Sequence, residues 1–183
     1  MIEIALRFIL EEINVYLKMQ GKEAVMSSYV DHAGSITSDT NGKLCITLLT
    51  IEQETSVRNM VETKRIANEY AQLKPAIRLN LSVLFGASAD NYDEALKVLS
   101  YTIAFFQSKN VFTAQNSPTL DAGFDKLVLE MESTNLQDWN NIWGMLGGKH
   151  IPAVVYKVKM LTIQEGLKTG TTPPILAINQ NPA

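Results

Sequence analysis

The residues that could perform acid–base, nucleophilic or metal chemistry in this sequence are few and widely separated. His32 and His150 are its two histidines, Cys45 is its one cysteine, and Glu130 and Glu132 lie two positions apart. Neither histidine has a neighbour at metal-ligand or nucleophile spacing. Cys45 lies in an alternating apolar segment, whereas a reactive thiol needs an accessible, electropositive setting. Glu130 and Glu132 would share one strand face without an apolar pocket to separate their pKa values, so we expect both to be solvated.

These patterns predict a protein that is not an enzyme, with no catalytic residue, no metal ligand and no cofactor. The alternative rests on Trp139 and Trp143, which stand four positions apart and could stack on a ligand. That spacing on a helix favours packing in the core instead. The alternative function is therefore a small-molecule-binding module or an enzyme that uses a pocket near the tryptophan helix, with Glu130 or Glu132 as the base.

Composition and charge are those of a globular protein with one main domain. The 183 residues are 46% hydrophobic and 19% charged, and the formal net charge at pH 7 is −3. Nucleic acid is not an expected partner, because general affinity for it rests on clustered lysine and arginine. The charge is uneven, however, since residues 54–78 contain five basic and three acidic side chains.

The N-terminal segment and the cysteine content indicate the compartment. Glu3, Arg7 and Glu11 interrupt the apolar residues of the first helix, so we expect neither a signal peptide nor a membrane span. A single cysteine cannot form an internal disulfide, which favours a reducing compartment. The sequence therefore predicts a protein that is cytoplasmic at synthesis and has no membrane partner.

Hydrophobic periodicity predicts a mixture of helices and strands. Spacings of three and four indicate amphipathic helices, and strict alternation indicates strands. The predicted helices cover residues 2–16, with a stop at Gly21, and residues 92–106 and 136–146; the predicted strands cover residues 24–30, 44–52, 77–85, 127–131 and 154–161. Residues 54–76 are interpreted as a long, partly helical excursion.

Turn and cap residues refine these boundaries. Asn41-Gly42 is the strongest hairpin dipeptide in the sequence, because both residues tolerate positive φ. Asp90 can cap the second helix, and Thr134 with Gln137 has the spacing of a capping box for the third. The element order predicts an α+β fold, in which a mixed, mainly antiparallel sheet carries about three helices on one face.

The last residues form a separate predicted segment, so that residues 1–163 are the domain and residues 164–183 an extended C-terminal tail. Pro173 and Pro174 enforce an extended backbone just before Ile175, Leu176 and Ile178. Such an apolar segment suits the addition of a strand to the edge of another sheet. The alternative, in which the tail folds back over its own domain or frays, stays open.

Three motifs in order carry a resemblance to a known family. They are LCITLLTIEQETSVRN at residues 44–59, IRLNLSVLFGASADNYDEALKVLSYTIAFFQS at 77–108, and LVLEMESTNLQDWNNIWGMLGGKHIPAVVYKVKMLTI at 127–163. Together they resemble the N-terminal-domain family of cap, or tail-terminator, proteins of phage-tail-like contractile injection systems. The resemblance spans about residues 3–163.

The resemblance implies a structural protein that forms a ring, usually of six copies, at the end of the tube and sheath distal to the baseplate. Such a ring stops polymerisation. The implied partners are other copies of the chain and the sheath and tube proteins of the same particle. The protein would be incorporated in the assembled injection particle, with later release or membrane attachment as alternatives. Many family members carry a second domain after this one, whereas about 20 residues follow here, so a full cap and a shorter adaptor both stay open.

The predicted interface with neighbouring subunits, sheath or tube lies on the basic excursion and in the tail. It consists of Arg58, Asn59, Lys64, Arg65, Ile175, Leu176 and Ile178.

Overall fold

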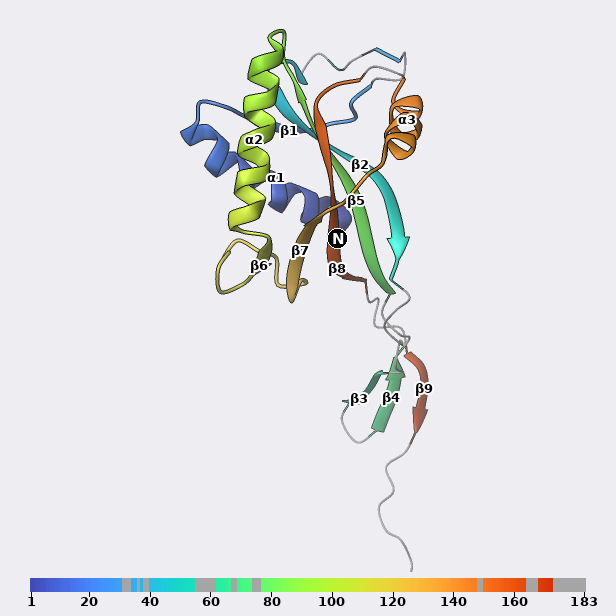
Figure 1. The fold of residues 1–183 in the computed structure, drawn as a ribbon. Coiled ribbons are helices and arrows are strands. Elements are labelled where there is room, and N and C mark those ends of the chain that lie inside the picture. The colour runs from blue at the N-terminus through green and yellow to red at the C-terminus, as the bar shows by residue number, and fades with distance from the viewer. Residues whose placement is uncertain are drawn as a thin grey trace, which may run out of the picture.

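The computed structural model describes residues 1–30, 34–35, 37, 40–54, 62–66, 69–73, 77–147, 150–163 and 168–172. The helices are α1 (Ile2–Met19), α2 (Tyr92–Ser108) and α3 (Leu136–Met145), and the strands are β1 (Ala24–Met26), β2 (Lys43–Gln53), β3 (Glu62–Ile66), β4 (Glu69–Leu73), β5 (Ile77–Ser88), β6 (Val111–Thr113), β7 (Lys126–Met131), β8 (Ala153–Ile163) and β9 (Lys168–Thr172). The predicted α+β class is confirmed (Figure 1).

A six-stranded sheet with the order β1-β2-β5-β8-β7-β6 forms the centre of the molecule. Its strands pair antiparallel, except that β1 pairs with β2 in parallel. The Asn41-Gly42 turn therefore does not close a hairpin, although Gly42 has the positive φ of 73° that the dipeptide predicted. Parallel neighbours need a crossover of a dozen or more residues, and β1 ends at Met26 while β2 begins at Lys43.

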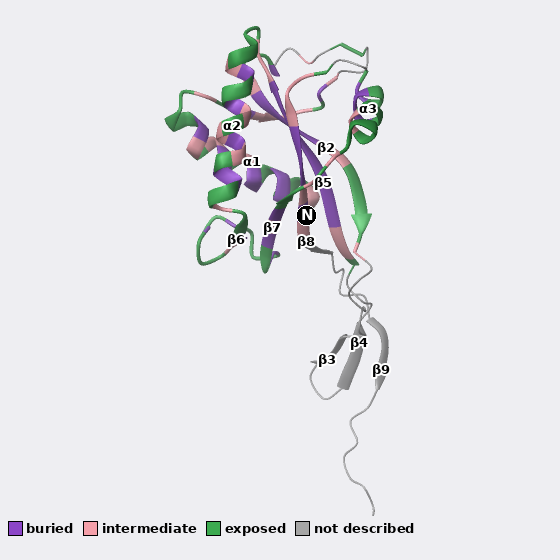
Figure 2. Cartoon of the chain, viewed as in Figure 1, coloured by how far each residue is buried: buried purple, intermediate pink, exposed green. Residues whose placement is uncertain are grey.

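The larger core lies between the sheet and helices α1 and α2. Alternation along β5 turns Leu81, Val83 and Phe85 towards this side, and all three are fully buried. The Phe85 ring lies 5.1 Å from that of Phe106 on α2 and 5.5 Å from that of Tyr156 on β8. This aromatic contact joins α2 to the two central strands. Figure 2 shows β5 coloured as buried over most of its length.

A second core lies on the opposite face of the sheet, under α3. Leu84, next to Val83 on β5, belongs to this core together with Trp143, Tyr29 and Val155. Trp143 is 6% exposed, so the prediction that it packs in the core is confirmed. The prediction that all helices lie on one face is wrong, because α3 has its own apolar stripe and the long central strands are apolar on both faces.

The observed caps differ from the predicted ones by one residue. Asn91, not Asp90, caps α2, and its side chain accepts a hydrogen bond from the Asp93 amide at 2.9 Å. The capping box of α3 is formed by Asn135 and Asp138 rather than by the two preceding positions, Thr134 and Gln137. The predicted pair, Thr134 and Gln137, and the observed pair, Asn135 and Asp138, have the same three-residue spacing. Asparagine is as good an N-cap as threonine or better, so the spacing alone did not distinguish them.

β1 is held at its outer edge by a side chain of α1. The Asn14 carboxamide accepts a hydrogen bond from the backbone nitrogen of Ala24 at 2.7 Å and donates one to the Ala24 carbonyl at 3.0 Å. The pair thus replaces the ladder partner that an edge strand lacks. This contact fixes the start of β1 against the helix.

We expect Asn14→Leu to lower the free energy of unfolding by about 1–3 kcal/mol, because both Ala24 groups lose their partner while size is kept. Urea denaturation measures the change. Val15→Ala, at a neighbouring side chain that is 69% exposed, is the control and should change stability by less than about 0.5 kcal/mol. Equal effects of the two substitutions would contradict this assignment.

A second sheet of three strands has the order β3-β4-β9. The partly helical interpretation of residues 54–76 is therefore wrong over residues 62–66 and 69–73, which pair as antiparallel strands. β9 pairs with β4 and lies within the segment predicted as an extended tail. Pairing of β3 with β4, and of β4 with the distant β9, outweighed the weak helical spacing of this segment.

Candidate interaction surfaces

Among the described residues, the potentially reactive side chains are not assembled into a catalytic set, and His32 lies outside the described residues. Within the described ranges, no group of three or more His, Cys, Asp or Glu side chains could hold a metal ion. Cys45 is buried, as predicted, and burial raises the pKa of its thiol. Its sulfur lies 3.5 Å from the Ser27 carbonyl oxygen and from the Thr47 hydroxyl. The thiol is therefore enclosed and hydrogen-bonded.

Glu130 and Glu132 each lie beside a lysine of β8. Lys159 donates to a Glu130 carboxylate oxygen at 2.5 Å, and the Lys157 ammonium is 3.5 Å from Glu132. Lys157 also donates to Glu52 at 2.9 Å, and this hydrogen bond raises the pKa of Lys157. The two glutamates thus form ion pairs on the sheet surface, a setting that does not favour the role of a base.

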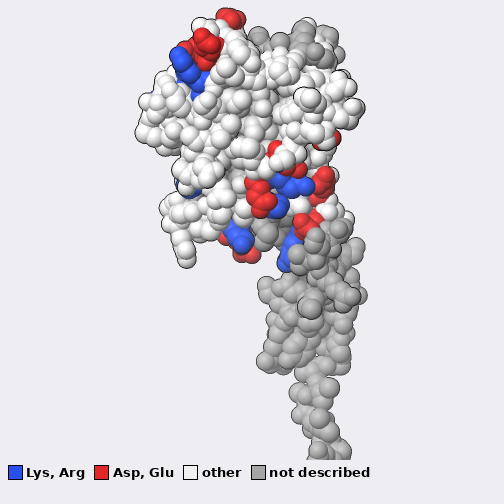
Figure 3. Space-filling view, in the orientation of Figure 1, with Lys and Arg blue, Asp and Glu red and all other residues white. Residues whose placement is uncertain are grey.

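These ion pairs form what we call the charged face, which consists of Glu52, Glu130, Glu132, Lys157 and Lys159. It lies on the same side of the sheet as α3, next to the end of β2 that Figure 2 shows exposed. Figure 3 shows basic and acidic side chains grouped together just above the grey residues, with a second such group at the upper left and mostly uncharged surface between them. Mixed charges of this kind favour a specific polar contact over general attraction to one sign of charge.

A groove of about 530 Å³ lies between the charged face and α3, and we call it the α3 groove. Strands β2, β5 and β8 supply one wall, and α3 with the segment before it supplies the other. Its lining comprises Leu49, Thr50, Glu52, Ser82, Glu132, Ser133, Thr134, Asp138, Ile142, Met145 and Val155. The groove therefore combines carboxylates and hydroxyls with an apolar wall.

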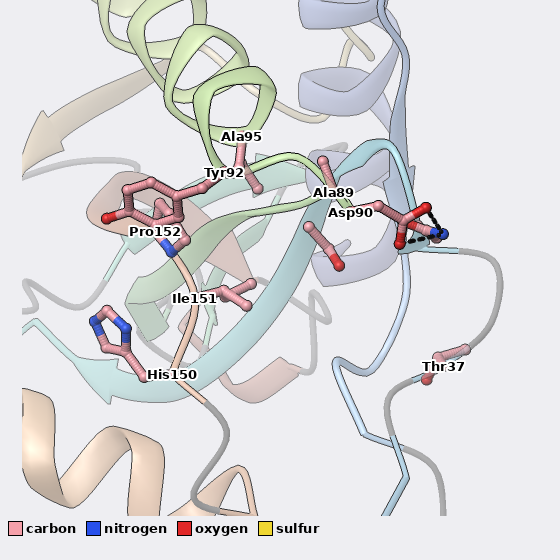
Figure 4. Close-up of a pocket in the computed structure, with 11 residues that line it drawn as sticks. Thr37, Ala89, Asp90, Tyr92, Ala95, His150, Ile151 and Pro152 are labelled. Atoms are coloured by element: carbon pink, nitrogen blue, oxygen red, sulfur yellow. Dashed lines mark hydrogen bonds between the residues drawn. The ribbon is translucent and has the colours of Figure 1, made fainter.

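Another pocket, of about 590 Å³, lies at the start of α2 (Figure 4). The Asn41 amide donates to both oxygens of Asp90 at 3.3 and 3.4 Å on one side of it. His150 lines the opposite side in Figure 4, and its ring packs against Trp143 at 5.4 Å. The His150 ring and the Asp90 carboxylate do not point towards one another in Figure 4, so these two side chains do not form an acid–base pair.

The structure locates two of the predicted interface residues. Lys64 and Arg65 lie on β3, where they pair with Ala71 and Tyr70 of β4. The others lie outside the described residues: Arg58, Asn59, Ile175, Leu176 and Ile178. The α3 groove was not predicted, because its side chains come from several separate elements. The polar residues Asn80 and Ser82, alternating within the apolar β5, were the signal in the sequence.

The three-stranded sheet continues the strand order of the larger sheet. The larger sheet contains the order β2-β5-β8, and the smaller sheet has the order β3-β4-β9. In the chain, β3 follows β2, β4 precedes β5 and β9 follows β8. Ile77 pairs with Ile163, and four positions before Ile77, Leu73 pairs with Lys168, five positions after Ile163.

Comparisons with known proteins point to one family. The family model described as the Pvc16 N-terminal domain matches residues 6–177. No curated protein matches the sequence. Within the described residues, none of the helices combines the length and apolar character needed to cross a membrane.

Two solved structures share the fold. The sheath/tube terminator of the extracellular contractile injection system PVC, in the extended state, matches with a TM-score of 0.70 and 14% identity, over 100% of this chain and 63% of that one. The tube-terminating cap of the anti-feeding prophage matches with a TM-score of 0.55 and 18% identity, over 84% of this chain and 56% of that one. This chain therefore spans about three fifths of the length of either protein.

Proposed function

The chain belongs to the Pvc16 N-terminal domain family, and on this basis we propose that it is a structural cap, or tail terminator, of a contractile injection system. In this role it binds the distal end of the tube and sheath and stops their polymerisation. The observation that carries the proposal is the likeness to the sheath/tube terminator over 100% of this chain. The likeness to a tube-terminating cap supports the same role.

The proposed assembly is a homo-oligomeric ring, most simply a hexamer, that contacts sheath and tube. A ring uses two different patches of each subunit, which meet head to tail and close by rotation. Two features described above supply such patches. One is the pair of outer edges of the three-stranded sheet, β3 and β9, which have one neighbour each among the described strands. The other is the charged face with the α3 groove.

The proposed interface keeps the residues predicted from the sequence. Lys64 and Arg65 on β3 would approach a neighbouring subunit, sheath or tube. Exposed strand edges pair readily with strands of another chain, and basic side chains add polar contacts there. The protein would be made in the cytoplasm and then incorporated in the particle.

A structural role also agrees with the rigidity of the fold. The long strands β5 and β8 are packed on both faces, by α1 and α2 on one side and by α3 on the other. A ring subunit must hold its neighbours in register, and it needs no reactive side chain to do so. The alternative, an enzyme or small-molecule module near the tryptophan helix, gains no support from the ion pairs of Glu130 and Glu132.

Particles assembled without this chain are expected to have tubes and sheaths of irregular length, because their growth lacks a stop. Electron microscopy of assembled particles measures the length distribution. Adding back the purified protein should restore a uniform length, and native mass measurement should show a ring in the particle fraction. The role is refuted if lengths are unchanged and the purified protein binds neither sheath nor tube.

A further inference from the structure

The floor of the α3 groove contains polar groups that lack partners. Ser82, on β5, is 8% exposed, and its hydroxyl makes no hydrogen bond with any residue of the chain that the structure describes. The Ser82 oxygen is not one of the fully buried unpaired atoms of the described residues, so it is open to the groove and can pair with a group there. Thr50, Ser133 and Thr134 also line the groove and likewise have no side-chain hydrogen bond within the described ranges. The groove thus offers hydrogen-bonding capacity that the fold itself does not use.

The carboxylates of the groove also exceed its cations. Lys157 contacts one oxygen each of Glu52 and Glu132, and the Asn135 amide contacts one oxygen of Asp138. The second oxygen of each of these three carboxylates accepts no hydrogen bond in the described part of the chain. A carboxylate can accept several hydrogen bonds, so these oxygens favour a group that brings positive charge and more than one donor.

The rest of the groove lining is apolar and comes from both of its walls. Leu49 of β2, Ile142 and Met145 of α3 and Val155 of β8 face the same space as the carboxylates. Apolar side chains next to hydrogen-bond acceptors fit a lysine or arginine side chain. Such a side chain can bury its methylene stem against the apolar residues while its charged end contacts the polar groups. Arginine matches better than lysine, because its planar group presents five donors in fixed directions to several acceptors.

From these observations we propose that the α3 groove binds an arginine side chain of a partner protein. The guanidinium would donate hydrogen bonds to the free oxygens of Glu52 and Glu132 and to the Ser82 hydroxyl oxygen, while the stem would lie against Ile142 and Met145. Charge-assisted hydrogen bonds of this kind are stronger than neutral ones. The proposal does not depend on the cap role, because it rests on the lining of the groove alone.

A short peptide tests the proposal directly. The probe is acetyl-Leu-Arg-Leu-amide, added to the full chain and followed by backbone amide NMR. The expected result is saturable shifts at groove residues such as Ser82 and Ser133, with a dissociation constant on the order of 1 mM. The matched peptide with citrulline in place of arginine keeps the shape and loses the charge, and it should bind at least about tenfold more weakly, which is about 1.4 kcal/mol.

Variants of the protein complete the test. Glu52→Gln combined with Glu132→Gln should weaken binding of the arginine peptide about tenfold. Glu130→Gln is the control, since Glu130 pairs with Lys159 outside the groove, and it should leave binding unchanged. Ser82→Ala should weaken binding without lowering the unfolding midpoint, because the hydroxyl has no internal partner to lose.

Three outcomes would overturn the proposal. They are equal binding of the arginine and citrulline peptides, an effect of Glu130→Gln as large as that of the groove variants, and an absence of saturable shifts at the groove. The last result would mean that water alone satisfies the groove. If particles assembled without the chain have irregular lengths and the peptide test fails, the cap role is kept and only the arginine proposal is overturned, so the two proposals fail separately.

Discussion

Replacing Phe85 by alanine is expected to lower the free energy of unfolding by about 3–5 kcal/mol, the usual cost of removing a fully buried aromatic ring. Phe85 is 0% exposed and lies at the centre of the larger core. Its ring makes edge contacts with Phe106 and Tyr156, so the substitution removes contacts that join α2, β5 and β8. This loss is a large part of the free energy of unfolding of a typical domain, which is about 5–15 kcal/mol.

Urea denaturation followed by circular dichroism measures this effect. Phe85→Leu keeps most of the volume and should cost less than about 1.5 kcal/mol. Leu136→Ala, at a side chain that is 88% exposed at the start of α3, should change stability by less than about 0.5 kcal/mol. A loss below 1 kcal/mol for Phe85→Ala would show that this aromatic contact does not hold the core together, contrary to our expectation of about 3–5 kcal/mol.

Truncation after Glu165 is expected to abolish ring assembly and attachment to sheath or tube while the domain stays folded. The shortened chain loses β9 but keeps Ile163, the last β8 residue that pairs with β5. The β3–β4 pair would remain as a two-stranded hairpin, which is marginally stable by itself. Thermal unfolding should therefore change little, whereas native mass measurement and binding to sheath and tube should show the loss.

A second truncation, after Thr172, separates the two parts of the C-terminal segment. It keeps β9 and removes Ile175, Leu176 and Ile178. If this chain assembles normally, β9 carries the assembly through the three-stranded sheet. If it fails as well, the apolar residues after the prolines carry it, in line with strand donation predicted from the sequence. Unfolding of the whole domain on either truncation would contradict the expectation.

The fold class could be predicted from the sequence because the central elements have strong periodicity, whereas the family was predicted from the resemblance of three motifs in order. β5 alternates between apolar residues and a polar series, and α1 has its apolar residues three and four apart. Those patterns arise from local geometry, in which successive strand residues face opposite sides and helix residues return every 3.6 positions. The same local signals placed both α2 and α3, although each cap was displaced by one residue.

Tertiary structure alone decided which elements meet. The parallel pairing of β1 with β2 and the position of α3 on the opposite face depend on partners far away in the chain. Residues 62–66 and 69–73 became strands because they pair with each other and with β9, whereas their own spacing was ambiguous. The α3 groove arises in the same way, since the Lys157–Glu52 hydrogen bond joins residues 105 positions apart. Short segments carry too little periodic information to fix such pairings, and it is the contacts between them that select one arrangement.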